Sequence, residues 1–258
     1  MNELVSLRRD GAIAHLRLNR PTQFNTVDIP TANAFLACCR EIAEAQGVRA
    51  VILSGEGKAF GAGGDLNELA VDPVAAAPSL IDPMHDAIRW IAELDVPFIA
   101  CLHGVVAGGS LSLAMACDLA IAAEGTKFNL AYVNIGATCD GGGSWSLPRM
   151  VGMRNAMAIA LLGDSFDAAE ALRLGLVNKV VPLAELQSSA EQMAQRLAAG
   201  PTLAIGRMKR LIRASFETDL DGQLDRERFD FISNAGTEDF GNAVAAFLRK
   251  QKPEFQGR

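Results

Sequence analysis

The stretch from Val96 to Cys117 constrains the fold most strongly, because its 22 residues carry no formal charge and are numerous enough to cross a bilayer. Five residues interrupt this run: Pro97, His103, Gly104, Gly108 and Gly109. Proline and glycine break regular structure, so the run divides into a short strand at Phe98–Leu102, a loop and a buried helix from about Ser110. Such buried segments are common in large α/β proteins. The sequence therefore predicts an α/β core and no membrane span.

The length and composition fit one large domain, or one domain with an appendage. The chain has 258 residues, of which 50% are hydrophobic and 21% are charged. A soluble chain of this size buries about three quarters of its unfolded surface, which is enough for one core. The formal net charge of −6 argues against a nucleic-acid binder, whose affinity depends on neutralising many phosphates. Any anionic ligand therefore needs a local cluster of cationic side chains.

The five cysteines form an odd set without the spacing of metal ligands, so we expect no metal site. They are Cys38, Cys39, Cys101, Cys117 and Cys139. The first residues of the chain lack the apolar segment of a signal peptide. Together these features predict a cytoplasmic protein with reduced thiols.

Strands and helices alternate along the first part of the chain. Residues 1–20 predict a β-hairpin, with His15 on its solvent face. Asp28 opens an amphipathic helix, and a buried strand follows at Ala50–Leu53. This alternation is typical of α/β proteins.

Helices predominate after about residue 165, where Asp167 and Glu170 have the spacing of a capping box. Three later helices are predicted, at residues 202–215, 220–234 and 238–250. Their apolar stripes are typical of helices that pack on neighbours or on another subunit. The pair Gly200-Pro201 is the predicted boundary between a core at residues 1–200 and a C-terminal helical region at 201–258.

Two glycine-rich loops each follow a buried strand and are the first candidates for chemistry. They are the segments 61–65, Gly-Ala-Gly-Gly-Asp, and 107–110, Ala-Gly-Gly-Ser. Neither loop has a phosphate-binding or dinucleotide-binding pattern. Two backbone N–H groups in an apolar wall can instead hold a carbonyl oxygen while negative charge grows on it. From spacing alone, tight turns and close helix packing explain these glycines equally well.

A third feature is the segment 139–145, in which one acidic residue, Asp140, precedes three glycines and a predicted helix. Asp140 fits an N-cap carboxylate, and it also fits a catalytic base if an apolar pocket surrounds it. The two interpretations are compatible. Cys139 has no histidine nearby in the sequence, so a buried thiol without a catalytic role is the simpler interpretation.

Five segments together resemble the enoyl-CoA hydratase/isomerase (crotonase) family over nearly the whole chain. They are LNRPTQFNT at 18–26, GKAFGAGGDLNEL at 57–69, HGVVAGGSLSLAMACDLAIAA at 103–123, LLGDSFDAAEALRLGLVNKVV at 161–181 and AFLRKQKPEFQGR at 246–258. The resemblance implies a spiral of ββα units with a C-terminal helical region that forms trimers, often paired into hexamers. It also implies a coenzyme A thioester substrate, whose carbonyl is held by the backbone N–H groups of Gly64 and Gly109.

The sequence departs from the family pattern where hydratases carry two catalytic glutamates, because Ser112 and Tyr132 occupy those positions. Neither side chain is a good base near neutral pH. Asp140 falls where members that move double bonds place an acidic residue, including the ring isomerase of phenylacetate breakdown. The resemblance therefore predicts an enoyl-CoA isomerase of fatty acid or aromatic acid catabolism, in which Asp140 shuttles a proton and Gly64 and Gly109 stabilise the enolate.

Three alternatives stay open at the level of sequence. One is a hydratase with an atypical base. A second is a 4-halobenzoyl-CoA dehalogenase, in which Asp140 is the nucleophile, Tyr132 stands where these enzymes have an aromatic residue, and His85 corresponds to a histidine base. The third is a protein that binds acyl-CoA without catalysis, since both usual glutamates are missing.

The resemblance also implies which residues bind the substrate. The pantetheine and acyl walls correspond to Phe24, Ala62, Leu66 and Tyr132, and further binding positions are Thr26, Asp65 and Gly108. Cationic side chains in the matching segments are candidates for the phosphates of coenzyme A, namely Arg20, Lys58, Lys250 and Lys252. No cofactor is expected beyond the coenzyme A of the substrate, and no nucleic-acid or membrane partner. A homotrimer or a homohexamer is expected.

Overall fold

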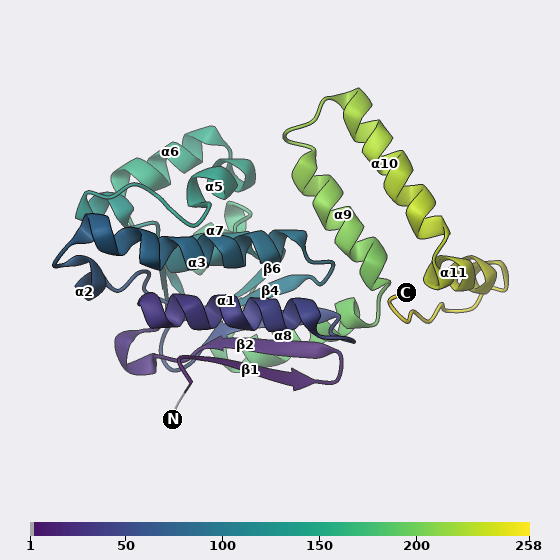
Figure 1. Ribbon diagram of the computed structural model, residues 1–258, viewed down its shortest axis with the longest axis horizontal. Helices are drawn as coiled ribbons and strands as arrows, with labels where there is room; N and C mark the ends of the chain where they lie inside the picture. The colour runs from purple at the N-terminus through teal and green to yellow at the C-terminus, as the bar shows by residue number, and fades with distance from the viewer. Residues whose placement is uncertain (1–2) are drawn as a thin grey trace.

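A computed structural model describes residues 3–258 of the chain (Figure 1). The strands are β1 Val5–Asp10, β2 Ile13–Leu18, β3 Ala50–Gly55, β4 Phe98–Leu102, β5 Val105–Ala107, β6 Leu119–Ala123, β7 Lys127–Asn129, β8 Phe166–Asp167 and β9 Lys179–Val181. The α-helices are α1 Ile29–Glu44, α2 Leu66–Leu69, α3 Pro73–Glu93, α4 Gly109–Ala116, α5 Gly143–Val151, α6 Met153–Leu162, α7 Ala168–Arg173, α8 Leu183–Ala198, α9 Thr202–Ala214, α10 Leu220–Ala235 and α11 Glu238–Leu248. Two short 3-10 helices are η1 Pro21–Gln23 and η2 Tyr132–Ile135.

Two sheets organise the first part of the chain. The larger has six strands in the order β1-β2-β3-β4-β6-β9, and only the β1–β2 hairpin is antiparallel. The smaller has three strands in the order β5-β7-β8. Helices connect the parallel strands, as short turns cannot. The predicted α/β class is confirmed, and the strand predicted at Phe98–Leu102 has those bounds.

Helices cover both faces of the six-stranded sheet. Helices α1 and α3 lie against each other in front of the sheet (Figure 1), and the larger apolar core lies beneath them. A second buried cluster lies between the other face and α8. The prediction that His15 faces solvent is wrong, because α8 covers its strand. His15 is 7% exposed, and its Nδ1 lies 3.5 Å from Glu191 of α8.

Sequence signals mark where several helices begin. Asp28 is the N-cap of α1 and accepts a hydrogen bond from the backbone of Thr31, and Asp167 does the same for α7 through Glu170. Helix α4 begins at Gly109, one residue before the predicted start. Within residues 3–258, no helix combines the length and apolarity that crossing a bilayer requires.

Helices α9–α11 follow Pro201 and extend to one side of the molecule, where the chain ends (Figure 1). The link between this region and the sheet is polar. Lys209 of α9 is 8% exposed, and its Nζ donates to Asp118 Oδ2 at 3.0 Å and to the carbonyl oxygen of Ile91 at 2.9 Å. Asp118 directly precedes β6, so this buried ion pair attaches α9 to the core. The division at residues 200 and 201 stays a proposal.

Candidate active site

The two glycine-rich loops lie against each other. The backbone N–H of Ala107 donates to the carbonyl oxygen of Gly61 at 2.9 Å. The backbone N–H of Gly63 donates to Ser110 Oγ at 3.1 Å, and Ser110 is 1% exposed. These bonds join the loop after β3 to the start of α4. Residues more than forty positions apart in the sequence therefore form one surface.

Backbone conformation favours glycine at two positions in these loops, Gly63 and Gly108. Gly63 has φ of +98° and Gly108 has φ of +53°, which side chains other than glycine rarely adopt. A Cβ on Gly63 would lie 3.2 Å from the carbonyl oxygen of Ala107 and 3.4 Å from the amide nitrogen of Gly109. A side chain at Gly63 would therefore push the loops apart.

The amide of Gly64 points away from the neighbouring backbone. The carbonyl oxygen of Gly63 accepts a hydrogen bond from Val27 N–H at 2.8 Å. In a planar trans peptide the C=O and N–H bonds point in opposite directions, so the N–H of Gly64 faces away from Val27. No acceptor within residues 3–258 receives it, whereas Gly63 and Asp65 both donate. Gly64 thus has a free donor, and the residue lines a cavity.

The amide of Gly109 is free for a related reason. Gly109 is the first residue of α4, and the carbonyl oxygen of Gly108 accepts from Leu111 N–H at 2.9 Å and Ser112 N–H at 3.2 Å. Its peptide carbonyl therefore points along the helix, and the N–H of Gly109 points outward from the helix start. Across the described residues, this donor has no backbone or side-chain acceptor.

Both free amides line one cavity of about 950 Å³. Helices α2 and α3 form one wall, and the segment 131–140 forms another. Eight of the predicted site residues line it: Thr26, Ala62, Gly64, Leu66, Gly108, Gly109, Tyr132 and Asp140. A small apolar recess of about 40 Å³ continues from it, between α3 and α4. The cavity offers an apolar chamber with two backbone donors.

Phe24 and Asp65 are the two predicted binding residues that do not line this cavity. Phe24 is 50% exposed, and its carbonyl oxygen accepts from Ala62 N–H at 3.0 Å. Asp65 caps α2, accepting from Asn67 N–H at 3.1 Å, and pairs with Arg20. The Asp65 carboxylate therefore makes its hydrogen bonds within the protein, to Asn67 and Arg20.

Asp140 is the carboxylate of the cavity, and it is not an N-cap. The N-cap of α5 is Gly142, without a side-chain contact, because the helix begins three residues beyond Asp140. Tyr132 donates its hydroxyl hydrogen to Asp140 Oδ1, and Ser112 Oγ lies 3.3 Å from the same hydroxyl. A Cβ on Gly109 would lie 3.7 Å from Asp140 Oδ1, so this oxygen is close to Gly109. Burial and the Asp140 charge raise the pKa of Tyr132, which keeps its hydroxyl a donor.

Two further groups border Asp140. His85 of α3 lines the cavity, and its Nε2 accepts from Gly141 N–H at 3.1 Å. That nitrogen therefore carries no hydrogen, and a neutral ring has its hydrogen on Nδ1. Burial raises the pKa of Cys139, which favours the thiol over the nucleophilic thiolate. This agrees with a cysteine that has no catalytic role.

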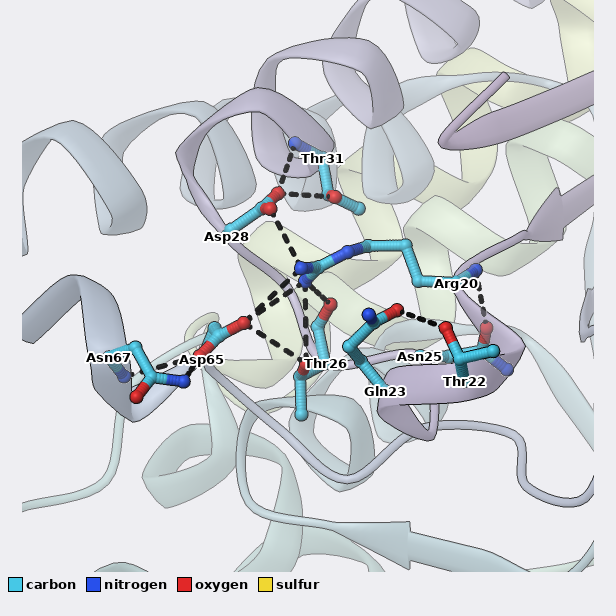
Figure 2. Close-up of polar contacts among 9 residues, drawn as sticks. All are labelled: Arg20, Thr22, Gln23, Asn25, Thr26, Asp28, Thr31, Asp65 and Asn67. Carbon is cyan, nitrogen blue, oxygen red and sulfur yellow. Dashed lines mark hydrogen bonds and ion pairs between the residues drawn. The ribbon is translucent and has the colours of Figure 1, made fainter. Parts of the chain in front are cut away.

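Arg20 does not have the place expected of a phosphate-binding residue. Figure 2 shows its guanidinium between two carboxylates. Its Nη2 lies 3.0 Å from Asp28 Oδ2 and 3.3 Å from Asp65 Oδ2. Two anionic partners already neutralise this cation. Lys58, Lys250 and Lys252 are exposed, and the segment after α11 lies at the opposite end of the molecule from α2 (Figure 1).

Acid is expected to weaken this cluster through Asp65. Burial acts to raise the pKa of Asp65, but hydrogen bonds from Asn67 and Arg20 hold it below its ordinary value. The stabilisation is therefore complete above about pH 4 and is lost as the pH falls through the lowered folded value. Urea unfolding below about pH 4 should show a steeper loss of unfolding free energy in the wild type than in Asp65→Asn. Equal slopes would contradict this role.

Sequence reasoning missed Ser110, whose buried hydroxyl joins the loops. It also missed the wall that α3 supplies through Leu80 and Ile81. The first had a signal, since Ser110 directly follows the second glycine pair. The second had no signal, because no local sequence feature indicates that α3 lines the same cavity as the glycine-rich loops.

Comparisons with known proteins identify the family. The enoyl-CoA hydratase/isomerase family model matches residues 8–258. A 1,2-epoxyphenylacetyl-CoA isomerase of Escherichia coli is 35% identical, with 100% of each chain covered. A short-chain-enoyl-CoA hydratase of Clostridium acetobutylicum is 33% identical, covering 97% of this chain and 96% of the relative. A 4-chlorobenzoyl coenzyme A dehalogenase of an Arthrobacter species is 31% identical, covering 96% and 91%.

A solved structure confirms the predicted crotonase fold. The enoyl-CoA hydratase of Bacillus anthracis superposes with a TM-score of 0.94 at 29% identity, covering 99% of this chain and 100% of that chain. The chain belongs to the enoyl-CoA hydratase/isomerase family, whose members act on acyl-CoA thioesters.

Proposed function

We propose that this protein is an enoyl-CoA isomerase that moves a carbon–carbon double bond in an acyl-CoA thioester. One observation carries the proposal. Among the described residues that line the cavity, Asp140 is the only carboxylate, and its Oδ1 lies close to Gly109, whose amide is free. A double-bond shift requires one base and a site for an enolate oxygen. Asp140, Gly64 and Gly109 supply these.

The reaction uses these groups in sequence. Asp140 removes the α-proton of a 3-enoyl thioester, and the electron pair of that C–H bond moves into the thioester, where the carbonyl oxygen gains negative charge. The amides of Gly64 and Gly109 hold that oxygen, and loss of one such donor typically costs about 10²–10³-fold in rate. Protonated Asp140 then returns the proton to the γ-carbon. The product is the conjugated 2-enoyl thioester, and the carboxylate is regenerated.

Hydration is disfavoured because water addition in this family uses two carboxylates. Ser112 and Tyr132 stand at those positions, and their hydroxyl oxygens lie 3.3 Å apart. Burial and the neighbouring Asp140 raise the pKa of Tyr132, so it does not serve as a base near neutral pH. The Tyr132 hydroxyl instead orients the Asp140 carboxylate.

The second candidate is a 4-halobenzoyl-CoA dehalogenase, favoured by His85 lying in the same cavity as Asp140 and Tyr132. In this reading Asp140 attacks the ring carbon that carries the halogen, halide leaves, and a water molecule deprotonated by His85 hydrolyses the aryl ester. The arrangement gives less support to this reaction, because the His85 Nε2 lone pair is occupied by Gly141 N–H.

Two substrates separate these functions. With a 3-enoyl-CoA, an isomerase increases the absorbance of the conjugated enoyl thioester. With 4-chlorobenzoyl-CoA, a dehalogenase releases chloride. An increase in absorbance with the 3-enoyl-CoA and no chloride from 4-chlorobenzoyl-CoA would support isomerisation. Chloride release without the absorbance increase would contradict isomerisation and support dehalogenation. Binding of straight, branched and aromatic thioesters without turnover would leave an acyl-CoA-binding protein.

We further propose that α9–α11 associate with other copies of the chain as a trimer or hexamer. These helices expose large apolar side chains, including Ile212, Leu220, Phe229, Phe231 and Phe247. Exposed apolar surface of this extent is typical of association sites.

A further inference from the structure

We propose that Arg20 is a positioning residue, which fixes the direction of the Gly64 amide through Asp65 and the backbone of residues 26–28. The inference rests on the proposed function, since it gives that amide a catalytic purpose. The Arg20 side chain is 14% exposed, and Asp28 and Asp65 are 15% and 13% exposed. A guanidinium buried with two carboxylates has a fixed geometry, because its planar fork matches several acceptors at once.

Arg20 contacts both segments that form the bridge between Val27 and Gly64: Thr26 in one segment and Asp65 in the other. Its Nη1 donates to the carbonyl oxygen of Thr26 at 2.6 Å, and Nη1 and Nη2 both donate to Asp65 Oδ2 at 3.3 Å (Figure 2). Val27 lies between these anchors. Its N–H donates to the Gly63 carbonyl oxygen at 2.8 Å, and its own carbonyl oxygen accepts from Asp65 N–H at 2.8 Å. Arg20 therefore clamps the bridge whose geometry points the Gly64 N–H into the cavity.

Both carboxylates also attach Arg20 to helices. Asp28 is the N-cap of α1, and α1 packs in the core. Its ion pair with Asp28 therefore fixes Arg20 to a rigid element. Asp65 is the N-cap of α2, whose Leu66 and Leu69 line the cavity. The Arg20 side chain thus joins α1, the loop that holds Gly64, and α2, which forms part of one cavity wall.

This arrangement predicts an effect on rate more than on binding. Charge grows on the thioester oxygen mainly in the transition state, so a misdirected amide raises the barrier while substrate binding changes little. Arg20→Gln should lower kcat by roughly 10- to 100-fold, with KM within about threefold. Arg17→Gln is the matched control. Arg17 also pairs with a carboxylate, Glu56 at 2.7 Å, but it is 39% exposed and has no hydrogen bond to residues 61–65. Its kcat should stay within about twofold of the wild type.

A spectroscopic readout separates positioning from general destabilisation. Infrared spectra of a bound, unreactive saturated acyl-CoA with a ¹³C-labelled thioester carbonyl report the hydrogen bonds to that oxygen. We expect the wild type and Arg17→Gln to lower the C=O stretching frequency equally, and Arg20→Gln to lower it less. Arg20→Lys keeps the charge without the planar fork and should lose the same part of the shift, which provides a test if Arg20→Gln does not fold.

The outcomes are distinguishable. A full frequency shift in folded Arg20 variants would overturn the positioning role, even if their activity fell. Absence of any shift in the wild type would instead refute the oxyanion site, and with it the proposed function.

Discussion

Replacing Asp140 with asparagine is expected to lower kcat for the double-bond shift by about 10³-fold. Asparagine keeps the shape of the side chain, and its carbonyl oxygen can still accept from Tyr132, but it cannot take up the α-proton. The dissociation constant for a saturated acyl-CoA should stay within about twofold, because both backbone donors remain. Stopped-flow absorbance of the conjugated product and calorimetric titration with the saturated thioester measure the two quantities.

Asp164→Asn is the matched control for this change. Asp164 is an exposed carboxylate, and its replacement should leave both kcat and binding unchanged. Turnover by Asp140→Asn at a tenth of the wild-type rate or more would remove Asp140 from the mechanism, because a positioned base contributes at least about 10²-fold.

Removing the Gly109 N–H has the second large expected effect. Proline is tolerated in the first turn of a helix, where its missing N–H breaks no intrahelical bond, and Gly109 is the first residue of α4. Gly109→Pro should therefore fold but lose one oxyanion donor, with kcat/KM lower by about 10²–10³-fold.

Gly109→Ala separates the lost donor from the added carbon atoms. A Cβ at this position would lie 3.7 Å from both Asp140 Oδ1 and the Tyr132 hydroxyl oxygen, which is ordinary contact distance. The alanine variant keeps the N–H and should retain far more activity than the proline variant. Equal activities in two variants with the wild-type circular dichroism spectrum would exclude the Gly109 amide as a donor.

Much of the fold could be predicted from local signals. The sequence itself shows three such signals: the hydrophobic run of β4, the N-cap aspartates of α1 and α7, and the apolar stripes of the last helices. His15 could not be placed correctly, because its burial depends on α8, which lies some 170 residues later. Alternation along one strand does not show whether a helix covers its second face.

The candidate site was only partly predictable. Glycine pairs marked both loops, and the family resemblance assigned Gly64, Gly109 and Asp140 their roles. The sequence did not distinguish an N-cap from a base at Asp140, because the Tyr132 contact decides the direction of the carboxylate. Nor did it show that Arg20 faces Asp28 and Asp65 instead of solvent, since such pairing requires the connection between β2 and α1 to meet the loop after β3.

The most direct test of the central claim follows a 3-enoyl-CoA in deuterated water by proton NMR. We predict that the wild type forms the conjugated 2-enoyl-CoA, that no water adds across the double bond, and that Asp140→Asn abolishes the conversion. One shuttling carboxylate should also return part of the original α-hydrogen to the γ-carbon. Formation of a 3-hydroxyacyl-CoA as the product, or an undiminished conversion by Asp140→Asn, would contradict the mechanism.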